Sequence, residues 1–242
     1  MTQDKVPSKK PGGSVAEKSS STAEIASFLA QARRSDPASA GRLVFALDAT
    51  MSRQPTWDRA LQIQASMFDA VARAGGLSVQ LVYFRGFGEC RASKWVMNSK
   101  ALRDLMTGID CRGGQTQIAK VLSHAVKENG AKKIDALVYI GDAMEENPDR
   151  LCQLAGELGL KGTRVFTFQE GHDSLAEQTF REIARLSGGA WFRLGPDSAR
   201  ELSELLAAIA VYASGGRVAL EARGNRGSNL LLEQMYGGKG RG

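Results

Sequence analysis

The sequence predicts an α/β fold, a doubly wound, mainly parallel sheet with helices on both faces and one antiparallel hairpin strand at its edge. First, short apolar runs alternate with helical patterns along the chain. Second, the runs at 43–47 and 136–140 are apolar throughout, as in strands that are buried on both faces of a parallel sheet. Third, the strand-like segment 77–84 is followed directly by another at 86–95, which suits a hairpin.

Helices are expected where apolar residues recur at helical spacing between these runs. Trp57, Leu61 and Ala65 recur in this way after the first strand, and Pro55 suits the first turn of their helix. Glycine pairs and Asp-Pro or Gly-Pro dipeptides mark the ends of elements. We expect helices at 23–34, 55–74, 98–107, 117–128, 149–158, 174–186 and 197–212, and further strands at 164–168 and 190–193.

The chain is long enough for one domain with a full core between two tails. It has 242 residues, of which 43% are hydrophobic and 24% are charged. We expect the domain at 41–213, a flexible polar N-terminal tail with a short helix at 1–40, and a glycine- and arginine-rich C-terminal tail at 214–242. An apolar patch at 230–236 suits either a docking peptide or packing against the domain.

The net charge of +6 is concentrated in the two tails. Residues 1–40 and 214–242 hold eleven basic and six acidic residues, a net charge of +5, so the predicted domain is close to neutral. A nucleic-acid-binding face on the domain is therefore not expected. The basic tails suit either solvated disorder or contact with nucleic acid or an anionic surface.

The sequence also carries signals about its compartment. No apolar run approaches the roughly 20 residues of a membrane span, and the polar N-terminus lacks the apolar core of a secretory signal. Cys90, Cys111 and Cys152 are odd in number and lack the paired spacing of a metal site, which favours free thiols in a reducing environment. We therefore expect a cytoplasmic protein without a membrane span.

Carboxylates and hydroxyls gather where predicted strands end. Asp48, Thr50 and Ser52 follow the first strand at alternate positions, Thr116 lies where a glycine-rich turn leads into a helix, and Asp142 follows the strand at 136–140. Ligands of open α/β sheets bind outside the carboxyl ends of the strands, so these residues belong at one edge. Each residue alone also suits an ordinary turn or helix cap. Together, two carboxylates and three hydroxyls indicate a hard divalent cation, Mg²⁺ or Mn²⁺, and they leave a coordination position open.

The same residues resemble the metal-ion-dependent adhesion site (MIDAS) of von Willebrand factor A (VWA) domains, of the kind found in intracellular bacterial proteins. The resemblance covers 41–213 and implies the Rossmann-like VWA fold. It implies a non-enzymatic protein-binding module in which an Asp or Glu of the partner completes the metal coordination, with an ATPase or assembly complex as the kind of partner. The sequence departs from the family pattern at Thr50, where serine is commonest, and at Ala143, where glycine is usual. The three matching elements are Asp48-x-Thr50-x-Ser52, Gly113-Gly114-Gln-Thr116 and Gly141-Asp142.

An enzyme is the alternative interpretation. Asp48 after one apolar strand and Asp142 after another also resemble a haloacid-dehalogenase-like, Mg²⁺-dependent phosphatase, in which Asp48 would be the nucleophile. That chemistry normally uses a second carboxylate two residues later as general acid and base, and this chain has Thr50 there. The sequence therefore favours the binding module over the phosphatase.

Overall fold

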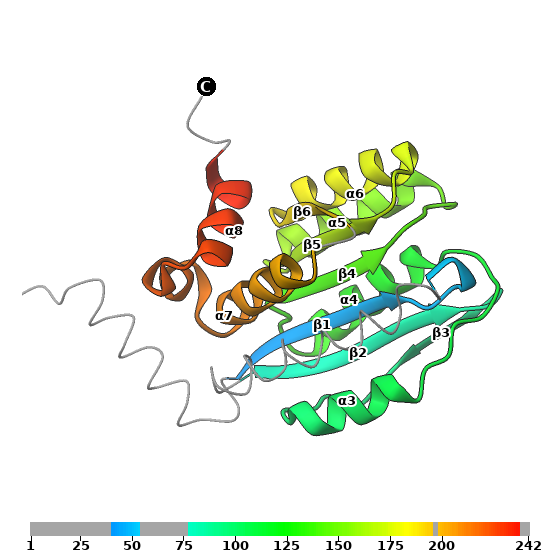
Figure 1. The fold of residues 1–242 in the computed structure, drawn as a ribbon, viewed down its shortest axis with the longest axis horizontal. Helices are drawn as coiled ribbons and strands as arrows, with labels where there is room; N and C mark the ends of the chain where they lie inside the picture. The colour runs from blue at the N-terminus through cyan, green and yellow to red at the C-terminus, as the bar shows by residue number, and fades with distance from the viewer. Residues whose placement is uncertain (1–39, 54–76, 196–197, 238–242) are drawn as a thin grey trace, which may run out of the picture.

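The computed structural model describes residues 40–53, 77–195 and 198–237. The predicted N-terminal tail at 1–40, apart from its last residue, and the predicted helices at 23–34 and 55–74 lie outside the described residues. Within the described part, a six-stranded sheet has the order β3-β2-β1-β4-β5-β6 (Figure 1). The strands are β1 (Gly41–Asp48), β2 (Leu77–Arg85), β3 (Glu89–Ala92), β4 (Ala136–Gly141), β5 (Arg164–Glu170) and β6 (Ala190–Leu194).

The strand pairing confirms the predicted doubly wound sheet. β1 lies at its centre and pairs in parallel with both β2 and β4, and β5 and β6 continue the parallel run. β3 returns antiparallel beside β2 and forms the predicted edge hairpin. All eight residues of β1 are buried, because helices cover both faces of the sheet.

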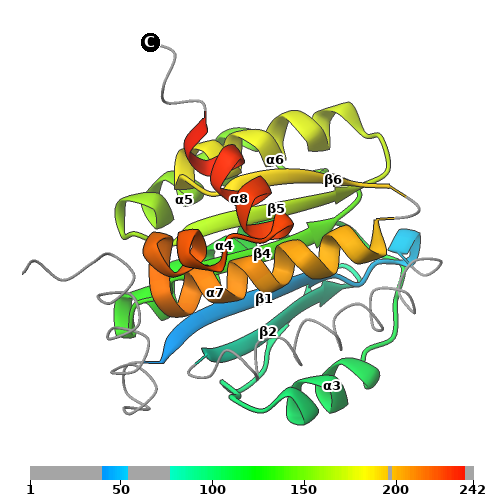
Figure 2. The same ribbon diagram turned by 60° about the vertical axis from the view of Figure 1, so that its left-hand side comes forward.

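Two helical layers enclose the sheet (Figures 1 and 2). Leu43, Phe45 and Leu47 of β1 belong to the core on the side of α3, α7 and α8. Val44 and Ala46 belong to the opposite core, on the side of α4, α5 and α6. This alternation along one strand supplies both cores. The helices are α3 (Ser99–Thr107), α4 (Ile118–Ala131), α5 (Pro148–Leu160), α6 (Ser174–Ser187), α7 (Ala199–Arg223) and α8 (Arg226–Tyr236), with a short 3-10 helix, η2 (Met51–Arg53), after β1.

The C-terminal helix is longer than the one predicted at 197–212. α7 continues to Arg223 with a break at Gly216, whose φ of 69° and ψ of −162° are not helical. α8 follows and packs against α7 and β6. Leu220 and Leu231 are fully buried, so apolar side chains fix a segment whose glycine and arginine content suggests a tail. Of the two alternatives for the patch at 230–236, the structure shows packing against the domain.

One helix of the described residues, α7, is long and apolar enough to cross a membrane by length and composition. Its Leu205, Leu206 and Ile209 are nevertheless completely buried in the core beside the sheet. Packing against β1 therefore accounts for its apolar character.

Candidate metal site

The loop after β1 holds three of the predicted metal residues in one compact turn. Asp48 is fully buried, and its Oδ1 accepts a hydrogen bond of 2.8 Å from the backbone N–H of Thr50. The hydroxyl oxygens of Thr50 and Ser52 lie 3.0 Å apart. Thr50 is 6% exposed, whereas Ser52 lies at the surface. The alternate spacing in the sequence therefore brings one carboxylate and two hydroxyls to the same turn.

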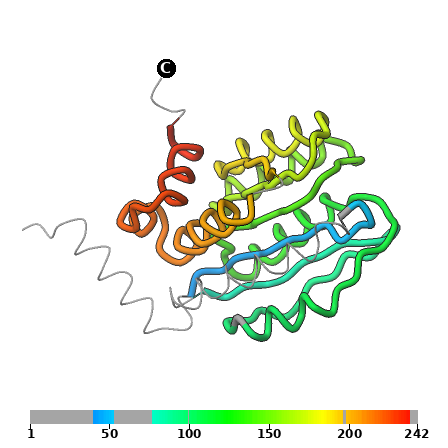
Figure 3. Tube along the Cα trace, viewed as in Figure 1, coloured from blue at the N-terminus to red at the C-terminus, as the bar shows by residue number. Residues whose placement is uncertain are grey.

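Backbone contacts join this loop to the segment that leads to Thr116. The N–H of Arg112 donates to the carbonyl of Ala49 at 3.0 Å, and Thr50 and Arg112 form an isolated parallel bridge. Ala49 also donates to the carbonyl of Phe84 at the end of β2. The chain between α3 and α4 thus passes beside the end of β1 (Figure 3).

Two glutamates join the Thr116 segment to the loop after β4. The Thr116 hydroxyl accepts from the N–H of Glu145 at 3.1 Å, and the Glu145 carboxylate accepts from the N–H of Thr116 at 3.2 Å. The Glu146 carboxylate accepts from the N–H groups of Ile118 and Ala119 in the first turn of α4. A carboxylate there satisfies open N–H groups and complements the helix dipole. The sequence offers no signal for either contact, because each spans nearly 30 residues.

Asp142 reaches the same edge through the register of the sheet. Ile140 of β4 lies opposite Leu47 of β1, so Asp142 and Asp48 leave neighbouring parallel strands within one residue of the same level. The Oδ1 atom of Asp142 is buried and has no hydrogen-bond partner among the described residues. A buried carboxylate oxygen normally has a partner, and a divalent cation would supply one here.

Only one glycine of the Gly113-Gly114 pair is required by its surroundings. A Cβ on Gly114 would lie 2.1 Å from the carbonyl oxygen of Gly86, whereas a Cβ on Gly113 would meet nothing within 4 Å. The close approach is completed by Gln115, whose N–H donates to the Gly86 carbonyl at 3.3 Å. The side-chain amide of Gln117 donates to the carbonyls of Gly86 and Arg85. Thr116 therefore lies between two residues that are attached to the β2–β3 turn.

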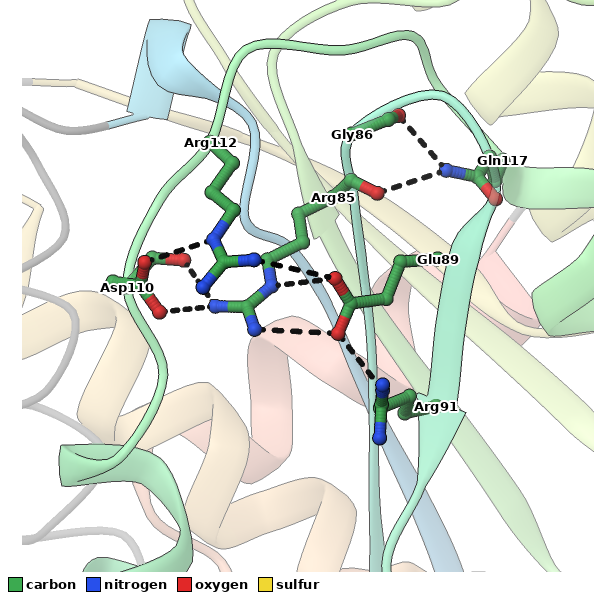
Figure 4. A network of polar contacts seen from close by, with 7 residues as sticks. All are labelled: Arg85, Gly86, Glu89, Arg91, Asp110, Arg112 and Gln117. Atoms are coloured by element: carbon green, nitrogen blue, oxygen red, sulfur yellow. Dashed lines mark hydrogen bonds and ion pairs between the residues drawn. The ribbon is translucent and has the colours of Figure 1, made fainter.

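The Arg85 side chain fixes the same segment from the other side (Figure 4). This arginine is 8% exposed, and its guanidinium donates to both carboxylate oxygens of Glu89, at 3.0 and 3.2 Å. It also donates to the backbone carbonyl of Asp110 at 2.9 Å and to the Asp110 carboxylate. Arg112 and Arg91 flank the two carboxylates. The sequence carries no signal for this network, since Arg85 and Asp110 are 25 residues apart.

The charges of this network shift the pKa values of its members. The bond from Arg85 lowers the pKa of Glu89. The bond from Arg112, and after it the bond from Arg85, lowers the pKa of Asp110. The bond to Glu89 in turn raises the pKa of Arg85. The ion pairs are therefore formed at neutral pH.

The donor set fits a hard divalent cation. The described part of the chain has no group of three or more His, Cys, Asp and Glu side chains that could hold a metal, so a metal here depends on hydroxyl oxygens as well as carboxylates. Carboxylate and hydroxyl oxygens without nitrogen or sulfur favour Mg²⁺ or Mn²⁺. The residues that could supply these oxygens are Asp48, Thr50, Ser52, Thr116 and Asp142.

The fold matches that of known proteins, although the sequence does not. No protein-family model matches the sequence, and no curated protein matches it. Among solved structures, the VWA domain of SpRpn10 superposes with a TM-score of 0.55 at 11% identity, over 68% of this chain and 94% of that domain. This is the VWA fold.

Two further VWA-type neighbours agree with this assignment. An aerotolerance-related membrane protein from Bacteroides fragilis matches with a TM-score of 0.54 at 16% identity, over 69% of this chain and 98% of that one. Proximal thread matrix protein 1 from the mussel byssus, described with a zinc-occupied MIDAS motif, matches with a TM-score of 0.53 at 13% identity. That match covers 72% of this chain and 47% of the byssus protein.

Proposed function

We propose that this VWA-fold protein is a divalent-metal-dependent protein-binding module. Asp48, Thr50, Ser52, Thr116 and Asp142 hold Mg²⁺ or Mn²⁺, and a carboxylate of the partner protein completes the coordination. The observation that carries the proposal is the buried Asp142 Oδ1, which lacks a hydrogen-bond partner among the described residues where three loops are joined. A cation at that point would satisfy a group whose burial otherwise destabilises the fold.

The nature of the metal follows from the donors. The byssus protein with its zinc-occupied MIDAS motif supports a divalent ion at this edge of the fold. In this chain the five residues offer only oxygen, which favours Mg²⁺ or Mn²⁺ over zinc. Mg²⁺ takes six ligands, so water or a partner carboxylate fills the remaining positions.

The partner is a protein that presents an acidic residue. Without a metal, the negative charges of Asp48 and Asp142 repel an acidic group. A bound divalent cation balances these two charges, so a partner carboxylate can approach and coordinate the metal. The resemblance to intracellular bacterial VWA proteins extends the proposal to an ATPase or assembly complex as the partner, in the cytoplasm.

A phosphatase is not favoured. A nucleophilic Asp48 would need an acid and base two residues later, and Thr50 has only a hydroxyl, which contacts the hydroxyl of Ser52. Asp48 also accepts the N–H of Thr50, which fixes it as part of a turn. Both contacts suit a metal-holding loop.

Calorimetric titration with MgCl₂ and MnCl₂ tests the proposal. Wild-type protein should show one saturable site, and Asp142→Ala and Asp48→Ala should each lower the affinity at least a hundredfold while the far-UV circular dichroism stays unchanged. Asp104→Ala, which removes an exposed carboxylate on α3, is the matched control and should bind as wild type does. Absence of binding to the wild type, or equal binding by Asp142→Ala, would contradict the proposal.

A further inference from the structure

Two large apolar side chains are exposed beside the candidate metal residues. Met51 is 55% exposed and Phe87 is 85% exposed. Met51 lies between two predicted metal residues, Thr50 and Ser52, and Phe87 follows Gly86, whose carbonyl accepts from the residues on either side of Thr116. Exposed apolar side chains that form a contiguous patch mark interaction sites. The other exposed large hydrophobic residues of the described part are Met97, Leu105, Leu160 and Leu175.

Met51 is part of the metal-holding turn itself. It lies between Thr50 and Ser52, whose hydroxyls are 3.0 Å apart. The bond from Thr50 to Asp48 holds the turn in shape, so Met51 is exposed from a fixed backbone. A partner group at the metal would therefore meet this side chain as well.

Phe87 is held next to the Thr116 loop by the β2–β3 turn. Gly86 before it has a φ of 63°, which fixes a left-handed turn, and its carbonyl accepts from Gln115 and Gln117 on either side of Thr116. The ion pairs of Arg85 with Glu89 hold the two strands on either side of that turn (Figure 4). The exposed ring of Phe87 is thus held by the β2–β3 turn, next to the segment that contains Thr116.

The charges around these side chains favour an acidic partner once the metal is bound. In the hairpin network three arginines, Arg85, Arg91 and Arg112, pair with two carboxylates, those of Glu89 and Asp110. Asp48 and Asp142 repel an acidic group until a divalent cation neutralises them. Apolar contact and metal coordination are therefore expected to act together.

We propose that Met51 and Phe87 form an apolar contact surface beside the metal, and that the partner segment carries an acidic residue flanked by large aliphatic side chains. This inference rests on the proposed function, because the acidic residue is placed by the metal. Covering one such side chain with an aliphatic partner is expected to tighten binding about tenfold.

Three synthetic peptides test this proposal, each acetylated and amidated. They are Gly-Leu-Glu-Leu-Gly, Gly-Gly-Glu-Gly-Gly and Gly-Leu-Gln-Leu-Gly, titrated into the full chain in saturating MgCl₂. Wild-type protein should bind the first about tenfold more tightly than the second, and the third should not bind measurably. In the double variant Met51→Ser, Phe87→Ser, the first two peptides should bind equally.

A matched double variant separates the local effect from a general loss of apolar surface. Met97→Ser, Leu160→Ser removes side chains that are 55% and 93% exposed and should retain the tenfold preference. Mg²⁺ titration of each double variant sets the MgCl₂ concentration that saturates its site, so that every peptide titration compares metal-loaded proteins. Equal binding of the first two peptides by wild-type protein that still binds Mg²⁺ would overturn the apolar surface alone. Failure of wild-type protein to bind Mg²⁺ would overturn the proposed function beneath it.

Discussion

Two buried arginines on neighbouring strands make similar polar contacts at opposite edges of the sheet, but they hold different parts of the molecule. Arg42, at the start of β1, and Arg85, at the end of β2, are 7% and 8% exposed. Arg42 stacks on Trp95 at 3.8 Å, pairs with Glu128 and donates to the Lys132 carbonyl. It thereby ties β1 to the end of α4.

Arg85 has equivalent contacts, but they join loops to each other rather than a strand to a helix. It joins the β2–β3 hairpin to Asp110, in the segment that leads to Thr116. Loss of Arg42 should therefore destabilise the whole fold, whereas loss of Arg85 should displace Thr116, a predicted metal residue. Burial of an arginine alone therefore does not indicate its role. The segment to which the arginine is bound does.

The largest expected effect is on stability at the Arg42 end. Arg42→Gln removes the ion pair and the contact with Trp95 and leaves Glu128 without its cationic partner, so the free energy of unfolding should fall by about 3 kcal/mol. Urea denaturation of the metal-free protein measures this. Mg²⁺ affinity should change less than twofold. A loss of Mg²⁺ binding by Arg42→Gln would show that Arg42 is not a purely stabilising residue.

Gly114→Ala tests whether the close approach to the β2–β3 turn positions Thr116, without changing any charge. Its Cβ would lie 2.1 Å from the Gly86 carbonyl, so the Thr116 segment must move away from the hairpin. A Mg²⁺ affinity about thirtyfold lower is expected, which corresponds to roughly 2 kcal/mol of overpacking strain. Gly113→Ala is the control next to it, with open space around its Cβ, and it should bind Mg²⁺ normally. Equal titrations for the two variants would show that the close approach does not position Thr116.

Arg85→Gln is expected to have a smaller effect on metal binding. The Asp110 segment loses its anchor while the contact between Gly86 and Gln115 remains, so Mg²⁺ affinity should fall about tenfold, close to 1.4 kcal/mol. Calorimetry of Arg85→Gln beside Arg42→Gln measures the contrast directly. If Arg85→Gln loses stability without losing Mg²⁺ affinity, its network is only structural.

The smallest effect concerns pH. Glu89 and Asp110 have pKa values lowered in the folded state by their arginine partners, so their pairing stabilises the fold above about pH 4 and is lost as the pH falls through the folded-state pKa values. Because both carboxylates are close to solvent, the effect is modest. Thermal unfolding in chelator, measured from pH 7 to pH 2, should show a shallower acid loss for Arg85→Gln than for wild type. Superimposable profiles would contradict this origin of the acid sensitivity.

The central sheet could be predicted because burial on both faces makes its strands visible as continuous apolar runs. The expected strands at 43–47 and 136–140 lie within β1 and β4. The hairpin could be predicted from two adjacent strand-like segments, and the structure confirms it as β2 and β3. Local sequence pattern was sufficient for both.

The end of α7, the helix α8 and the supports of the site could not be predicted in the same way, although the predicted helix at 197–212 matches the first part of α7. The break at Gly216 and the packing of Leu231 depend on the shape of the core, which composition does not show. The contacts of Thr116 with Glu145 and of Arg85 with Asp110 depend on where long loops pass. Four of the predicted metal residues follow from strand ends and Thr116 from a glycine-rich turn, whereas the residues that hold them in place follow only from the three-dimensional structure. Metal binding by those ligands stays a prediction.

The most direct test of the metal site is a crystal structure of the protein grown in MnCl₂, with anomalous diffraction data that locate the manganese. One Mn²⁺ ion is expected at roughly 2.1 Å from an oxygen of Asp142, with the hydroxyls of Thr50, Ser52 and Thr116 around it. An ordered site without a manganese peak at saturating Mn²⁺, or a peak held by other residues, would contradict it.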